Sequence, residues 1–223
     1  MTERLVIAID GPSGSGKSST AKGVASALGL AYLDTGAMYR AVTCAYLDAG
    51  VTPANEAGVI DATTSARLEI STDASDQWVR VNGADVTQRI REPEISANVS
   101  AVSTVAACRA DLVARQRAII DAAEVGIVAE GRDITTVVAP DAHVRLLLTA
   151  DPEARMARRK AELGEKVDDT QLADQILRRD SDDSKLVNFT TAADGVTHLD
   201  STFLDLEETI QAVLDLVRRT INA

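Results

Sequence analysis

The composition of this 223-residue chain is that of an ordinary globular protein, with 45% hydrophobic and 26% charged residues. These fractions exclude disordered, collagen-like and membrane-spanning classes, and the length favours one domain with an insertion. The net charge of −11 opposes binding to nucleic acid or to an anionic membrane, so neither is an expected partner. Cys44 and Cys108 lie far apart and near neither histidine, which favours reduced thiols in a cytoplasmic protein, expected to be a monomer.

The first expected elements are a strand, a glycine-rich turn and a helix. Residues 5–9 form an apolar run rich in β-branched side chains, typical of a strand buried on both faces of a parallel sheet. In residues 17–28, small and apolar side chains recur at steps of three and four. This spacing predicts a helix that Gly29 ends.

An insertion with antiparallel strands is expected next. Residues 67–72 and 78–82 alternate between apolar and polar side chains, and Asn82-Gly83 is a strong turn signal, so we expect a hairpin. Two successive helices are then expected from Pro93 onward. Their apolar positions are Ile95, Val99, Val102 and Ala106, followed by Leu112, Gln116, Ile119 and Ile120.

Three short apolar runs later in the chain predict further strands of the parallel sheet. They lie near residues 127–129, 144–148 and 196–199, each between helical patterns. Strands that alternate with helices in this way are typical of an α/β fold with a central parallel sheet.

Two later helices carry start signals. Asp151 followed by Pro152 is typical of a helix N-terminus. Asp205 with Glu208 three residues later predicts a capping box at the start of the last helix. The expected apolar stripe of that helix is Leu206, Ile210, Val213, Leu214 and Val217.

The turn after the first strand is a phosphate-binding loop by its spacing, Gly-Pro-Ser-Gly-Ser-Gly-Lys-Ser. Its backbone amides can hold the phosphates of ATP or GTP, Lys17 can reach the β and γ phosphates, and the Ser18 hydroxyl can bind Mg²⁺. The guanine-reading and switch motifs of regulatory GTPases do not occur in the sequence. The expected nucleotide-binding residues are Gly11, Pro12, Ser13, Gly14, Ser15, Gly16, Lys17, Ser18 and Ser19.

Two further motifs, Asp-Thr-Gly-Ala-Met-Tyr-Arg at 34–40 and Glu-Gly-Arg-Asp at 130–133, make the chain resemble the bacterial cytidylate kinase family over its whole length. The resemblance implies a P-loop NTPase fold, a three-layer α/β/α sandwich forming a single nucleoside monophosphate kinase domain. The core would comprise about 1–40, 96–150 and 190–223, the monophosphate-binding insertion about 41–95, and the helical lid about 151–189.

The resemblance also assigns roles to individual residues. Lys17, Arg132 and Arg158 would be catalytic, and the lid residues Arg155 and Arg158 would contact ATP. Arg40 and Arg132 would bind the acceptor phosphate, while Asp133 would read the cytosine edge. The full set of expected acceptor-binding residues is Asp34, Thr35, Arg40, Ser103, Arg109, Arg132, Asp133, Arg179, Asp183 and Lys185.

The expected activity is reversible transfer of the γ-phosphoryl of ATP to CMP or dCMP, with Mg²⁺ bound by Ser18. Two alternatives stay open: a kinase for UMP or a small metabolite such as shikimate, and a nucleotide-binding protein without activity. Thr135, where relatives commonly have glycine, and Lys185, where they have a phosphate-binding arginine, are the departures that favour the alternatives.

Overall fold

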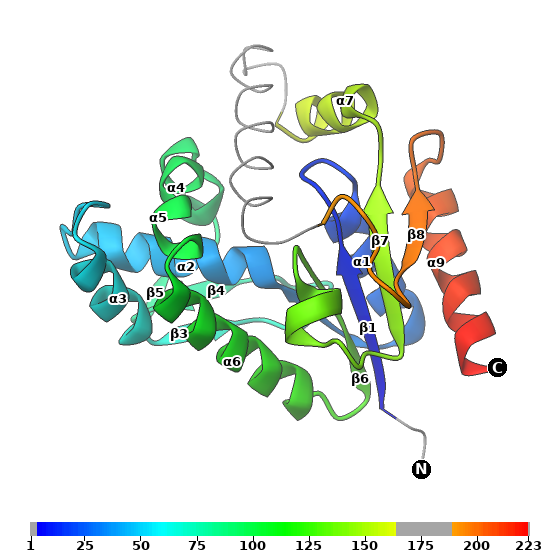
Figure 1. Ribbon diagram of the computed structural model, residues 1–223, viewed down its shortest axis with the longest axis horizontal. Coiled ribbons are helices and arrows are strands. Elements are labelled where there is room, and N and C mark those ends of the chain that lie inside the picture. Colours follow the sequence, from blue (N-terminus) through cyan, green and yellow to red (C-terminus); the bar gives the residue numbers. More distant parts are fainter. Residues whose placement is uncertain (1–3, 164–188, 223) are drawn as a thin grey trace. The chain divides into compact units, whose positions relative to one another are not determined.

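The computed structural model describes residues 4–163 and 189–222, which divide into two compact units (Figure 1). Among the described residues, the first unit contains 4–32, 123–163 and 189–222, and the second contains Leu33–Ala122. The second unit extends beyond the expected insertion, residues 41–95, at both ends. The expected division into core, insertion and lid stays a prediction. No helix in the described part of the chain is long and apolar enough to cross a membrane.

The main sheet confirms the predicted parallel α/β fold. Its strands, in the order β2-β6-β1-β7-β8, are β1 (Leu5–Asp10), β2 (Ala31–Asp34), β6 (Gly126–Gly131), β7 (Val144–Thr149) and β8 (Thr197–Asp200). The pairs β1–β6, β1–β7 and β7–β8 are parallel. Because Asp10 pairs with Gly131, β1 and β6 end at the same level, and the segments that follow them leave the sheet at its carboxyl edge.

The helical elements of the first unit are α1 (Lys17–Leu28), the π-helical turn η2 (Ile134–Val138), α7 (Pro152–Leu163) and α9 (Leu206–Ile221). The capping box predicted for α9 is confirmed, since Asp205 and Glu208 each accept a hydrogen bond from the other's backbone N–H. Helix α9 packs on α1 at Gly23, where an added Cβ would lie 2.2 Å from the Cδ1 of Ile210. Leu206, expected in the buried stripe, is instead 51% exposed because it is the first residue of the helix.

The second unit contains a small antiparallel sheet of three strands, β3 (Leu68–Ile70), β4 (Val79–Val81) and β5 (Ala84–Asp85). The predicted pairing of the first two strands is confirmed. Asn82 and Gly83 both have positive φ, 52° and 83°, as a type I′ turn requires, and this turn joins β4 to β5. The sequence analysis missed β5 because a two-residue strand has no detectable alternation.

The helical elements of the second unit are α2 (Thr35–Asp48), α3 (Glu56–Thr64), the 3₁₀ turn η1 (Arg89–Arg91), α4 (Pro93–Asn98), α5 (Ser100–Ser103) and α6 (Ala106–Ala122). Of the two helices predicted after Pro93, the second is confirmed as α6 and the first differs from the prediction. The first helix expected after Pro93 is therefore broken into α4 and α5. At the ends of these helices, the side chains of Asn98 and Thr104 donate hydrogen bonds to Glu94 O and Ser100 O. Such bonds compete with helix continuation.

Candidate nucleotide site

The glycine-rich loop follows β1 and leads directly into α1, as the motif predicts. Gly14 and Gly16 have φ of 75° and 88°, a left-handed backbone region that favours glycine. A Cβ on Gly14 would also lie 2.7 Å from the main-chain oxygen of Arg155, so only glycine lets α7 approach the loop this closely. The loop presents the N-terminus of a twelve-residue helix, where backbone N–H groups and the helix dipole favour an anion.

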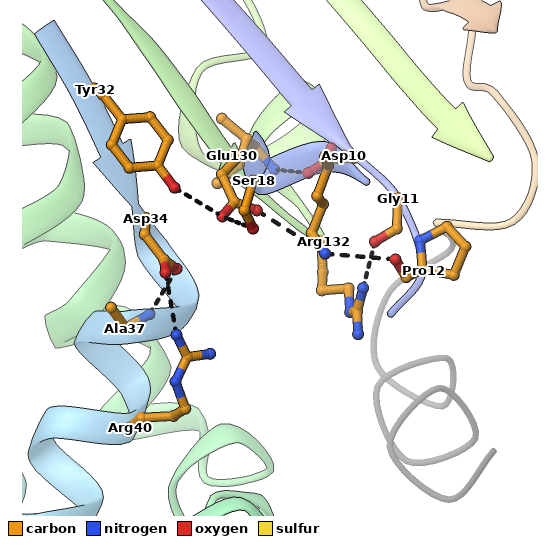
Figure 2. A network of polar contacts seen from close by, with 12 residues as sticks. Asp10, Gly11, Pro12, Ser18, Tyr32, Asp34, Ala37, Arg40, Glu130 and Arg132 are labelled. Carbon is orange, nitrogen blue, oxygen red and sulfur yellow. Dashed lines mark hydrogen bonds and ion pairs between the residues drawn. The ribbon is translucent and has the colours of Figure 1, made fainter. Parts of the chain in front are cut away.

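Ser18 lies against the carboxylate of Glu130, near the end of β6 (Figure 2), and Lys17 lies near the same carboxylate. Ser18 Oγ donates a hydrogen bond to Glu130 Oε1 at 2.6 Å, and the Tyr32 hydroxyl donates to the same oxygen at 3.2 Å. Lys17 Nζ lies 3.9 Å from Glu130 Oε2 and 3.4 Å from the main-chain oxygen of Pro12. Glu130 is only 2% exposed, so the charged groups interact with little competition from water.

Glu130 is the residue that sequence reasoning missed. The sequence analysis used it only as part of a motif, although an acidic residue at the end of the strand beside β1 was the available signal. The oxygen atoms of Ser18 and Glu130 are donors of the kind that Mg²⁺ prefers, and Mg²⁺ commonly takes one or two protein oxygens together with phosphates. Within residues 4–163 and 189–222 there is no group of three or more His, Cys, Asp or Glu that could hold a metal by itself.

Arg132 and Asp133 follow β6 and lie beside the loop. The Arg132 guanidinium donates a hydrogen bond from Nη1 to the main-chain oxygen of Gly11, and it stacks on the ring of Phe189 with its Cζ 4.7 Å from the ring centroid. Phe189 is buried, and the face of its ring attracts the positive charge of the guanidinium. Asp133 is also buried and directly precedes η2.

Arg155 and Arg158 of α7 donate hydrogen bonds to main-chain carbonyl groups of the loop. Arg155 Nη1 donates to Ser13 O and Arg158 Nη1 to Ser15 O, both at 3.1 Å. Arg158 also donates from Nη2 to the main-chain oxygens of Ser201, at 2.6 Å, and Leu204, at 3.1 Å. These contacts attach α7 to the loop and to the segment before α9. Direct contact of either arginine with ATP stays a prediction.

The remaining expected acceptor residues that the structure describes lie in the second unit. Asp34 Oδ1 accepts from the backbone N–H of Ala37 at 2.7 Å and so caps α2, which begins at Thr35. Asp34 Oδ2 also pairs with Arg40 Nη2 at 3.1 Å (Figure 2). Ser103 ends α5 and is buried, and Arg109 lies in α6, beyond the break between these helices.

The structure therefore brings together Asp34 and Arg40 within one unit, and Lys17, Ser18 and Arg132 around the loop in the other. Three further expected acceptor residues, Arg179, Asp183 and Lys185, lie outside the described residues.

Known proteins resemble this chain over nearly its whole length. The family model described as cytidylate kinase matches residues 7–219. A protein of Cutibacterium acnes named cytidylate kinase is 57% identical over 222 residues, 99% of each chain. One of Streptomyces avermitilis with the same name is 43% identical over 215 residues, 96% of this chain and 92% of that one.

Among solved structures, an uncharacterized protein from Eubacterium ventriosum has the same fold with a TM-score of 0.50. The two share 12% sequence identity, and the match covers 96% of this chain and 99% of the other. The family model and the two relatives extend over nearly the whole sequence. On this evidence the chain belongs to the cytidylate kinase family.

Proposed function

We propose that this protein is a cytidylate kinase that transfers the γ-phosphoryl of ATP to CMP or dCMP, giving ADP and the corresponding diphosphate. The observation that carries the proposal is the cluster of Lys17, Ser18 and Glu130 at the phosphate-binding loop, with Arg132 attached to Gly11 of the same loop. It occurs in a chain that is 57% identical to a protein with this name.

The donor is proposed to bind along the loop and the start of α1. The backbone N–H groups of residues 11–19 would hold the phosphates, and Lys17 would pair with the β and γ oxygens. Ser18, supported by Glu130, would hold the magnesium ion, whose charge neutralises the transferring phosphoryl group. The hydroxyl proton of Ser18 is donated to Glu130 at 2.6 Å. The lone pairs of Ser18 Oγ can therefore bind a cation.

The acceptor is proposed to use the residues that the resemblance assigns. In the first unit, Arg132 would bind the acceptor phosphate and the buried Asp133 would read the amino group of cytosine. In the second unit, Asp34, Thr35, Arg40, Ser103 and Arg109 remain proposed acceptor ligands. The other proposed acceptor ligands are Arg179, Asp183 and Lys185.

The chemistry needs positioning and charge compensation rather than a general base. The phosphate of CMP is already an anion near neutral pH, so it can attack the γ-phosphorus without losing a proton to the protein. Holding both substrates in line and neutralising the charge on the transferring group would supply most of the acceleration. Lys17 and Arg132 are the cations proposed for this role, together with Arg158 as α7 closes over bound ATP.

The proposal is tested by measuring ADP formation from ATP and Mg²⁺ with CMP, dCMP, UMP, AMP and shikimate presented separately at equal concentration. We expect turnover with CMP and dCMP at least tenfold above that with the other three, because cytosine offers Asp133 an amino donor that uracil and shikimate lack, and the amino group of adenine lies on a larger, two-ring base. Turnover with UMP or shikimate alone would establish the alternative acceptor. ATP binding without turnover on any acceptor would establish the non-catalytic alternative.

Glu130→Gln is expected to lower kcat about 10- to 100-fold and to raise the Mg²⁺ concentration needed for half-maximal rate, because loss of an oriented carboxylate behind a metal ligand commonly costs this much. The glutamine keeps the size of the side chain but removes the charge that Lys17 and Ser18 face. Initial rates at a series of free Mg²⁺ concentrations measure both effects.

The matched control is Glu124→Gln, which removes the same charge from an exposed position just before β6. It should leave the Mg²⁺ dependence unchanged. An unaltered Mg²⁺ dependence in a folded Glu130→Gln protein would contradict the role given to Glu130.

For its setting in the cell, we propose a cytoplasmic monomer that acts on small molecules and does not bind nucleic acid. Two observations support this: Cys44 and Cys108 are buried as free thiols, and the net charge of −11 repels polyanions.

A further inference from the structure

Asp10 is a buried carboxylate at the junction of β1 and the phosphate-binding loop, and the proposed reaction gives it no role. It is 2% exposed and accepts three hydrogen bonds. The donors are Ile134 N at 2.9 Å, Thr135 N at 2.8 Å and Thr135 Oγ1 at 2.6 Å. Burial raises the pKa of the Asp10 carboxyl, and the hydrogen bonds from Thr135 and Ile134 oppose this rise.

All three donors belong to η2, the turn that directly follows Arg132 and Asp133. Its hydrogen bonds run from Val138 N to Asp133 O and from Ala139 N to Ile134 O, which is the wide spacing of a π-helix. The first N–H groups of any helical turn lack partners inside the turn. Asp133 makes no side-chain capping bond, and Asp10 supplies the acceptor in its place.

The segment that carries Arg132 and Asp133 is therefore attached at both ends. Before it, Gly131 pairs with Asp10 in the parallel ladder of β6 and β1. After it, Ile134 and Thr135 are bonded to the side chain of the same Asp10. One residue thus holds both ends of this short connection.

The Thr135 hydroxyl is the part of this attachment that depends on a side chain of η2. A residue without a side-chain hydroxyl at this position could supply only the backbone N–H. The hydroxyl makes the shortest of the three bonds to a carboxylate that water does not reach. Charge-assisted hydrogen bonds of this kind are stronger than neutral ones and more specific in direction.

We propose that Asp10 and Thr135 are positioning residues that hold η2 and thereby set where Arg132 and Asp133 meet the acceptor nucleotide. This inference rests on the proposed function, in which these two residues bind the acceptor phosphate and base. Ser18 contacts Glu130, and Lys17 contacts Glu130 and Pro12, which all lie outside η2. Loosening η2 therefore weakens acceptor binding and leaves ATP binding intact.

The test compares Thr135→Val, Thr135→Ser and the control Thr63→Val in steady-state assays with ATP and CMP. Valine replaces the hydroxyl with a methyl group of similar size, while serine restores the hydroxyl. Thr63 is as buried as Thr135, but its hydroxyl bonds to Val59 O and Cys108 Sγ in the second unit. Thermal unfolding of each variant separates loss of stability from loss of position.

We expect Thr135→Val to raise the KM for CMP about tenfold, with the KM for ATP within twofold of wild type, since a misplacement of about 1 Å can cost up to about 100-fold and loss of one of three hydrogen bonds displaces η2 less. Thr135→Ser should have KM values for CMP and ATP within twofold of wild type. Thr63→Val should change only the melting temperature. Asp10→Asn, which keeps one acceptor oxygen but loses the charge, should repeat the rise in the KM for CMP.

An unchanged KM for CMP in Thr135→Val would overturn the inference. So would equal rises in both KM values, or a serine variant as impaired as the valine variant. A wild-type protein that forms no product with CMP in the acceptor series refutes the proposed function itself. An active wild type with an unaffected valine variant refutes only the positioning role.

Discussion

Replacing Lys17 with alanine is expected to lower kcat about 10³-fold, or about 4 kcal/mol of transition-state stabilisation, while the protein stays folded. The ammonium group is proposed to pair with the β and γ phosphates, where negative charge moves during transfer, and alanine offers no substitute. Its partner Glu130 keeps the hydrogen bonds from Ser18 and Tyr32, so the site does not collapse. Steady-state kinetics and a thermal melt measure the two parts of the prediction.

Lys22→Ala is the matched control, because it removes the same charge from the same helix. The Lys22 ammonium lies 5.5 Å from the centroid of the Tyr32 ring. We expect kcat within twofold of wild type and a loss of about 0.5–1 kcal/mol of stability. Turnover within tenfold of wild type in a folded Lys17→Ala protein would be incompatible with the proposed mechanism.

Replacing Arg132 with alanine is expected to lower kcat/KM for CMP about 10²- to 10³-fold. The guanidinium is proposed to bind the acceptor phosphate, and removal of one preorganised charge-stabilising group commonly has this effect. In the structure the guanidinium contacts the Gly11 carbonyl and the Phe189 ring. Alanine therefore removes both the positive charge and the contacts that position it. The KM for ATP should change much less, since the loop and Lys17 remain.

Arg132→Lys distinguishes charge from geometry. Lysine keeps the positive charge but has no planar fork to bind a phosphate twice or to stack on Phe189. We expect it to recover no more than about a tenth of the wild-type kcat/KM. Arg219→Ala, on the exposed side of α9, is the control and should retain wild-type kinetics. Full activity in Arg132→Lys would show that charge alone suffices, and full activity in Arg132→Ala would remove Arg132 from the site.

Features made by neighbouring residues were predictable from the sequence. The phosphate-binding loop needs only eight successive residues between a buried strand and a helix, and each part was confirmed. The type I′ turn at Asn82-Gly83 and the capping box of α9 are equally local. In all of these, the backbone conformation and the hydrogen bonds depend only on residues close together in sequence. Residue type and spacing are therefore enough to predict them.

Features that depend on pairing across the chain were not predictable in this way. The roles of Glu130 and Asp10 rest on contacts with Ser18 and Thr135, 112 and 125 residues away in sequence. Those contacts exist because β1 and β6 are neighbours in register, and strand order is decided by how the whole sheet buries its apolar faces. From the sequence, Lys17 and Ser18 are predicted ligands of the nucleotide phosphates and of Mg²⁺, and these roles stay predictions.

Arg155 and Arg158 of α7 likewise combine a local feature that the sequence predicts with contacts that it does not. The three-residue spacing of Arg155 and Arg158 is enough to predict that they share one face of the helix. Their hydrogen bonds to the carbonyls of Ser13 and Ser15 could not be predicted from the sequence. The ends of α4 and α5 likewise depend on which polar side chains reach the backbone. By itself the sequence determined the fold class, the phosphate-binding loop and the family of this protein. The tertiary structure decided which buried carboxylates support that loop, because a carboxylate's partners are set by the strands packed beside it and not by its neighbours in sequence.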